Sequence, residues 1–218
     1  RALRRGPEAS ENFPQDVVDL RALLGPPQEN QFLHAIPGED TNVPLWILGS
    51  SLFGAQLAAM LGLPYTFASH FAPQALLKAV EIYRERFEPS EQLAEPYVMV
   101  GCNAIVADTE EEAKRLFTSP QQNSTRMVRG TRGQLPPPID DIEAFWSPAE
   151  KAQASSMLAC SFYGSPTTIG GKLAPLIEET GADELMVAAA IWDHSARVRS
   201  FELLADAMGQ EQRVRKAG

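Results

Sequence analysis

The chain has 218 residues, of which 44% are hydrophobic and 22% are charged, a composition typical of globular rather than disordered proteins. Its 19 Lys and Arg against 28 Asp and Glu give a net charge of −9, which argues against nucleic acid or an anionic membrane as a partner, since both bind basic surfaces. No apolar stretch approaches the roughly 20 residues of a membrane span, and nothing at the N-terminus resembles a signal peptide.

The first sixty residues predict two helices and two strands. A helix is expected over 10–24, ended by Gly25, and a short strand over 31–36. The continuous apolar run 45–48 predicts a strand buried on both faces, as in a parallel sheet. A second helix follows it directly over 52–61.

The alternation of strands and helices continues through the rest of the chain. Strands are predicted over 65–69, 97–107 and 184–191, with a weaker candidate over 158–162. Helices are predicted over 73–87, from Thr109, from Ser147 to about residue 154, from Ser165 to Gly181, and over 195–208. This order indicates one α/β domain over 1–218 with a parallel sheet and crossover helices. The four strand–helix units that start at residues 45, 65, 97 and 184 are too few for a closed eight-unit barrel, which has roughly 30 residues per unit.

Residues 119–138 are predicted to form a long polar loop that ends in three prolines. Loops of this length in compact domains are usually lids or disordered segments. Arg126, Arg129 and Arg132 lie in the loop, either as a solvated cluster or as part of a lid that contacts an anionic ligand. We expect the segment from Arg126 to Pro138 to be a mobile lid.

The sharpest local signal for a ligand site is the run from Gly49 to Gly54, between a buried strand and a helix. A helix N-terminus has unpaired N–H groups and a partial positive charge, so it binds phosphate well. Gly49 allows close approach to the backbone, and the hydroxyls of Ser50 and Ser51 flank the free N–H groups. The run is either a phosphate site without a lysine or an ordinary serine N-cap.

Two histidines are weaker candidates for catalysis. His70 follows Ser69 at the carboxyl end of a predicted strand, where α/β ligand sites lie. The alternative is a histidine that forms hydrogen bonds within the loop and has no role in ligand binding. His194 follows Asp193, yet consecutive strand residues point to opposite faces, so this pair is poorly placed to form a dyad. Asp193 or Ser195 is expected to cap the last helix. No metal-site spacing, Gly-x-Ser-x-Gly elbow or Walker-type loop is present.

Cys102 and Cys160 indicate the cellular compartment. Each lies in an apolar run, and two cysteines are too few for a disulfide framework. We therefore expect two buried, reduced thiols in a cytoplasmic protein. The chain begins with Arg1 rather than Met, which indicates processing, truncation or an incomplete sequence.

Several stretches resemble the bacterial luciferase-like flavin monooxygenases. They are Val43-Pro-Leu-Trp-Ile-Leu-Gly-Ser-Ser51, Gly54-Ala55, Gly62-Leu-Pro-Tyr-Thr-Phe-Ala68, Leu135-Pro-Pro-Pro138, Gly164-Ser-Pro166, and Asp193-His194 with Arg197 and Arg199-Ser-Phe-Glu-Leu-Leu-Ala205. They occur in the order of that family and cover essentially the whole chain. The resemblance implies a (β/α)8 TIM barrel, of which this chain carries only about strands 5–8, starting after the fourth strand.

The resemblance also implies a cofactor site. In that family the loop after the fifth strand holds the phosphate of FMN, and the matching positions here are Gly49, Ser50, Ser51, Phe53 and Gly54. Ser69 and His70 match the region beside the flavin ring. The family has no universal side-chain base, because reduced flavin reacts with O2 while the protein excludes water. No catalytic residue is therefore assigned beyond the weak candidates His70 and His194.

The implied function is a flavin-dependent monooxygenase that uses reduced FMN and O2 on a small organic substrate. Coenzyme F420 is the alternative cofactor, and a flavin-binding protein without turnover is the alternative function. A separate flavin reductase is a possible partner, and a homodimer is expected. Because four units leave a sheet edge open, we expect the 218 residues alone not to be a self-sufficient fold.

Overall fold

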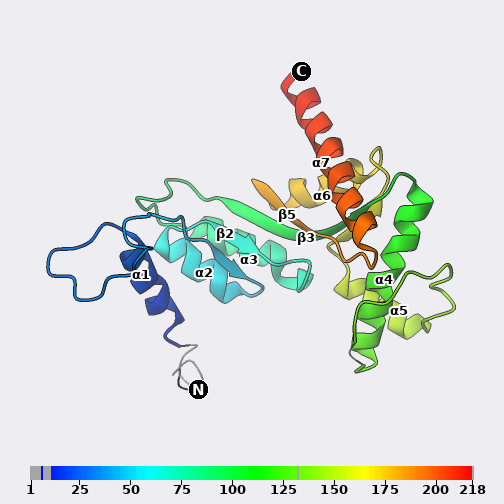
Figure 1. Ribbon diagram of the computed structural model, residues 1–218, viewed down its shortest axis with the longest axis horizontal. Coiled ribbons are helices and arrows are strands. Elements are labelled where there is room, and N and C mark those ends of the chain that lie inside the picture. The colour runs from blue at the N-terminus through cyan, green and yellow to red at the C-terminus, as the bar shows by residue number, and fades with distance from the viewer. Residues whose placement is uncertain (1–5, 7–10, 132, 218) are drawn as a thin grey trace.

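The structure is a computed structural model that describes residue 6 and residues 11–131 and 133–217. Its centre is a five-stranded parallel sheet accompanied by seven α-helices and one short 3-10 helix among these residues (Figure 1). In chain order the elements are α1 (Phe13–Leu24), β1 (Ile47–Gly49), α2 (Leu52–Leu61), β2 (Tyr65–Phe67), η2 (Pro73–Ala75), α3 (Leu76–Glu85), β3 (Val98–Val106), α4 (Glu110–Val128), α5 (Pro148–Met157), β4 (Ser161–Gly164), α6 (Ile169–Thr180), β5 (Glu184–Ala188) and α7 (His194–Ala217).

The long strand β3 organises the sheet. β1 pairs with β2, and β2 pairs with the first three residues of β3. Met99 pairs with both Thr66 of β2 and Glu184 of β5, so β2 and β5 lie on opposite edges of β3. β4 pairs with the last four residues of β3, on the same edge as β2. The path β1-β2-β3-β5 therefore contains the four predicted strand–helix units, and β4 is an additional short strand.

The two faces of the sheet differ in burial. Paired strand residues point to the same face, and the row Ile47, Tyr65 and Val98 is buried against the helices. The main apolar core lies on this face, between the sheet and α2, α3, α6 and α7. On the opposite, inner face the side chains of Leu48 and Met186 are 65% and 56% exposed. Over β1, β2, β5 and the first part of β3 the described helices thus cover one side only, whereas at the carboxyl end of β3 Ile105 is buried with Leu116 and Phe117 of α4.

The run 45–48 shows this one-sided burial directly. Ile47 is buried against the helices, while Leu48 on the inner face is exposed, as expected for a chain whose four units leave the sheet open. The strand itself is confirmed as β1. No strand forms over 31–36, which is irregular and contains a cis bond between Ile36 and Pro37. The predicted helix start at residue 10 lies outside the described residues.

Helix α2 shows how the sequence sets the packing on the covered face. Ala55, Ala58 and Ala59 are fully buried, and their small side chains let α2 lie close to both α3 and β1. Gly62 ends the helix with φ of +62°, a left-handed conformation that disfavours a side chain. The chain turns there directly into β2.

Helix α4 corrects the predicted loop over 119–138. It continues to Val128 despite Pro120 inside it, so residues 119–128 are helical and the connection begins only at Arg129. The reason is tertiary packing, because Gln122 and Thr125 belong to a polar face of α4 that is buried. The Gln122 side-chain amide donates to the carbonyl of Pro137 at 2.9 Å, which ties the connection back onto the helix. Burial here outweighs the helix-breaking tendency of proline.

Among the described residues, no helix is long and apolar enough to cross a membrane. Cys102 and Cys160 are both free and buried, as predicted. Burial raises the pKa of the Cys102 thiol to about 12, so this cysteine stays protonated.

Candidate functional site

The start of α2 lies directly after the carboxyl end of β1. Ser51 is the N-cap residue in extended conformation, and no side chain caps the helix. The first turn contains no acidic residue, and Ser51, Leu52 and Phe53 are exposed. The partial positive charge of this helix end is therefore available to an anion.

The backbone around this helix start is in contact with Tyr65 of β2. The Tyr65 hydroxyl donates to the Ser51 carbonyl at 3.4 Å, and burial raises the pKa of Tyr65 so that it remains a donor. A Cβ at Gly54 would lie 3.5 Å from the Cα of Gly49 and 3.5 Å from Tyr65 Cε2. The two glycines thus bring the strand end and the helix start into close contact, with Ser50 and Ser51 between them.

Three other helix starts, those of α4, α5 and α7, already carry a side-chain acceptor. Thr109 caps α4, Ser147 and Glu150 form a full capping box on α5, and the Asp193 carboxylate accepts from the N–H of Ala196 at 2.8 Å on α7. At the turn before α6, the Glu110 carboxylate accepts from the Ser165 N–H at 3.1 Å. The starts of α1, α3 and α6 also lack a side-chain cap on the first turn, so what distinguishes the start of α2 is its place directly after the carboxyl end of β1.

Glu110 is itself held by several partners. It pairs with the Lys172 ammonium and accepts from the Thr168 hydroxyl at 2.7 Å. The Lys172 contact, followed by the Thr168 hydrogen bond, lowers the Glu110 pKa to about 2. This carboxylate is therefore ionised at neutral pH and disfavours a second anion at the start of α6.

Ser69 joins the end of β2 to β3. Its side chain is fully buried, and its hydroxyl donates to the Gly101 carbonyl at 2.5 Å. Its contact with the cofactor stays a prediction.

His70 lies on the inner face, next to β3. Its backbone N–H donates to the Gly101 carbonyl at 2.9 Å, and its ring is half-buried with no hydrogen-bond partner on Nδ1 in the described part of the chain. Asn103, two residues after Gly101, donates from its side-chain amide to the Ser161 hydroxyl at 2.9 Å. Gly101 and Asn103 were missed in the sequence, although strand alternation along β3 places both on the face of Met99.

His194 is not part of a dyad. It is the first residue of α7, and its Nδ1 lies 2.9 Å from an Arg197 guanidinium nitrogen. Asp193 instead caps α7, which confirms one of the two caps expected there. The structure therefore gives no support to catalysis by an Asp193–His194 pair.

The arginines of the predicted lid do not converge on an anion site. Arg129 forms two hydrogen bonds with the Glu150 carboxylate, at 2.7 and 3.1 Å, and its guanidinium lies 4.7 Å from the Phe145 ring centroid. The Arg126 guanidinium lies 3.5 Å from the Gln134 carbonyl oxygen. Arg132 lies outside the described residues. Arg129 is thus already neutralised within the protein.

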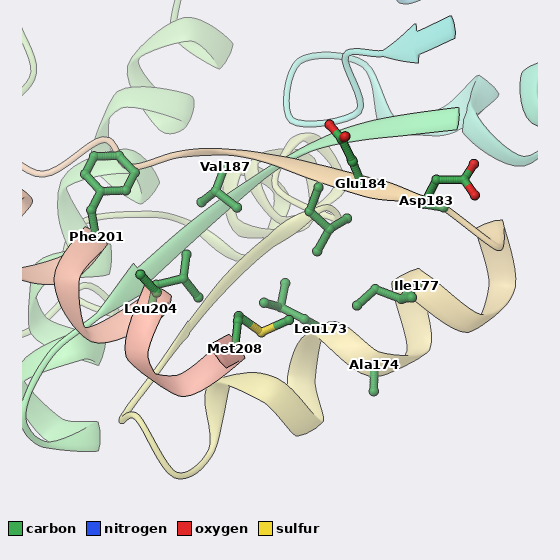
Figure 2. Close-up of a pocket in the computed structure, with 12 residues that line it drawn as sticks. Leu173, Ala174, Ile177, Asp183, Glu184, Val187, Phe201, Leu204 and Met208 are labelled. Carbon is green, nitrogen blue, oxygen red and sulfur yellow. The ribbon is translucent and has the colours of Figure 1, made fainter. Parts of the chain in front are cut away.

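A groove of about 670 Å³ lies elsewhere, between α6, β5 and α7 (Figure 2). Leu173, Val187, Leu204 and Met208 give it apolar walls. It opens at the free edge of β5 on the helix-covered face, and not at the carboxyl ends of the strands. The groove is therefore separate from the candidate site. In the described residues no cluster of three or more His, Cys, Asp or Glu side chains is arranged to hold a metal ion.

Comparison with known proteins identifies the family. A family model described as luciferase-like monooxygenase matches residues 12–184. The chain is 46% identical over 208 residues to YvbT of Bacillus subtilis (strain 168), which covers 94% of this chain and 62% of that protein. It is also 46% identical over 206 residues to a luciferase-like monooxygenase of Escherichia coli (strain K12), with the same coverage. The chain thus spans 62% of the length of these relatives.

Solved structures agree with this result. The crystal structure of apo-MsnO8 superposes with a TM-score of 0.81 at 30% identity, covering 96% of this chain and 66% of that one. The monooxygenase RslO1 from Streptomyces bottropensis, at 15% identity and a TM-score of 0.61, shares the fold, with 95% of this chain and 63% of that one covered. The four-strand path β1-β2-β3-β5 is part of a (β/α)8 barrel, and the chain belongs to the luciferase-like monooxygenase family.

Proposed function

We propose that the protein is a flavin-dependent monooxygenase in which the start of α2 holds the phosphate of FMN. The observation that carries the proposal is the uncapped, acid-free N-terminus of α2 directly after β1. Family membership supports the oxidoreductase class, and the carboxyl ends of the strands are where barrel enzymes place their active sites.

Each part of the site has a defined task in this proposal. The hydroxyls of Ser50 and Ser51 and the N–H groups of the first turn donate to the phosphate oxygens, while the Tyr65 hydroxyl holds the Ser51 carbonyl in place. When bound, reduced FMN supplies the electrons for the reaction with O2. Leu48 and Met186 on the inner face provide an apolar surface that excludes water from the flavin.

Titration with FMN and riboflavin tests the phosphate site. Riboflavin lacks the phosphate, so it loses at least two hydrogen bonds to a charged group, each contributing about 1.5–3 kcal/mol. We expect the complete protein to bind FMN at least about a hundredfold more tightly than riboflavin. Equal affinities would contradict the assignment of α2 as the phosphate site, and tighter binding of coenzyme F420 would replace FMN as the cofactor.

Oxygen consumption separates an enzyme from a flavin-binding protein. With reduced FMN supplied by a separate flavin reductase, a monooxygenase consumes O2 in a way that depends on a small organic substrate. A protein that binds FMN but leaves the rate of flavin oxidation and its products unchanged with every substrate class tried would be a binding protein. We further propose a homodimer in the cytoplasm, which sedimentation and cell fractionation would test.

A further inference from the structure

The His70 ring is pressed against the backbone of β3 at Gly101. A Cβ built at Gly101 would lie 2.6 Å from His70 Nδ1 and 3.0 Å from Cε1, closer than real Cβ atoms approach. The backbone fixes the same contact, because the His70 N–H and the Ser69 hydroxyl both donate to the Gly101 carbonyl, at 2.9 and 2.5 Å. Glycine at position 101 is therefore what allows the imidazole to lie over the inner face of the sheet.

The environment of the ring decides which nitrogen carries the proton. Nδ1 is buried and has no hydrogen-bond partner in the described residues. A neutral imidazole has one N–H and one bare nitrogen, and a buried N–H without an acceptor is rarer than a buried acceptor without a donor. We assign the proton to Nε2, on the side of the half-buried ring that Gly101 does not cover.

The position of His70 relates it to the proposed phosphate site. Ser50 and Ser51 follow β1, whereas the His70 ring lies over β3, two strands away in the order β1-β2-β3. Two strand spacings amount to about 10 Å. A ligand whose phosphate binds at the start of α2 can contact His70 with a ring system only if a linker of about this length joins the two. In FMN the ribityl chain joins the phosphate to the isoalloxazine ring in this way.

We propose that His70 donates a hydrogen bond from Nε2 to the isoalloxazine ring of FMN, and that Gly101 is the positioning residue that orients the donor. The inference rests on the proposed function. Reduction makes the flavin ring richer in electrons, so a fixed N–H donor binds the reduced form more strongly than the oxidised form. His70 thereby raises the reduction potential of the bound flavin.

The test uses H70A, H70Q and G101A variants in the complete protein. The dissociation constants of oxidised and reduced FMN and the midpoint potential of bound FMN are measured for each. We expect H70A to weaken binding of reduced FMN by about three- to tenfold, to weaken binding of oxidised FMN less, and to lower the midpoint potential. Glutamine retains a side-chain N–H donor, so H70Q should restore part of the potential. G101A keeps the histidine but displaces its ring, and should also lower the potential.

The control is H34A, because His34 is exposed, lies in the connection that precedes β1 and contacts Glu39. It should leave all three quantities at wild-type values. The proposal is wrong if H70A has the wild-type potential, or if it weakens both redox forms equally. It is also wrong, together with the proposed function, if the wild-type protein binds no flavin. Tighter binding of FMN than of riboflavin combined with an unchanged H70A protein would overturn the role of His70 alone.

Discussion

Replacement of Ser51 by Asp separates the structural from the functional role of the start of α2. Ser51 is the N-cap but its hydroxyl makes no capping hydrogen bond. Aspartate is a strong N-cap residue, and a negative charge at a helix N-terminus is favourable by about 0.3–1 kcal/mol. We therefore expect S51D to stabilise the ligand-free protein by about 0.3–1 kcal/mol, which raises the melting temperature by up to a few degrees.

The same substitution should abolish FMN binding. Two like charges about 4 Å apart near a protein surface repel by about 4 kcal/mol, and salt screening reduces this value. The loss of one hydrogen bond to a charged phosphate adds about 1.5 kcal/mol or more. The sum exceeds about 3 kcal/mol, which corresponds to a more than hundredfold weaker affinity. The double variant S50A/S51A removes two donors without adding repulsion and should cost about 1–3 kcal/mol.

Fluorescence titration with FMN and thermal melts without ligand measure the two effects. S147D is the matched control, because it adds the same charge at the N-cap of α5, where a capping box already exists. It should leave FMN affinity unchanged. If a folded S51D protein were to bind FMN within tenfold of the wild type, the phosphate would lie elsewhere.

Three further predictions concern stability. G62A should destabilise the protein by at least about 1 kcal/mol in denaturant unfolding, because φ is +62° and the new Cβ would lie 2.5 Å from Ser90 Cβ; an unchanged midpoint would refute this. Y83F should cost about 1–3 kcal/mol, since the buried hydroxyl donates to the Leu63 carbonyl at 3.0 Å and accepts from the Tyr97 N–H at 3.1 Å, and a loss below the error of the denaturation curve would contradict it. The pKa of Glu110 is lowered from 4.5 to about 2 in the folded protein. Its ion pair therefore contributes fully to the free energy of unfolding above pH 4.5, and this contribution is lost as the pH falls toward 2. E110Q should make the free energy of unfolding depend less on pH across that interval, and parallel curves for the two proteins would count against the interaction.

The strand–helix order was predictable from the sequence because it depends on local patterns. Apolar runs that alternate with helix-start signals identified β1, β2, β3 and β5, and the capping sequence at Ser147 identified α5. The extent of α4 was not predictable, because its helical state beyond Ser119 depends on burial of a polar face against a connection that follows it in sequence. Long-range packing of this kind leaves no local signal.

In the candidate site, only the residues that are consecutive in sequence could be placed together from the sequence. The glycine and serine residues around α2 lie together since they are consecutive in sequence. The burial of Ser69 was not predictable, because its orientation depends on one long-range hydrogen bond, to the Gly101 carbonyl. Gly101 carries no motif of its own, and its importance follows only from the ring packed against it.

The pairing of β3 with β5 has a consequence for the synthesis of the protein. Met99 pairs with Glu184, so the partner of this edge is made 85 residues later, after all of α4, α5, β4 and α6. Ribosomes add about 5–20 residues per second, and β3 therefore leaves the ribosome with one edge unpaired for roughly 4–17 seconds. During that interval the nascent chain exposes the unpaired backbone N–H and C=O groups of this edge, and chaperones that bind extended segments should associate with it most strongly between the emergence of β3 and that of β5.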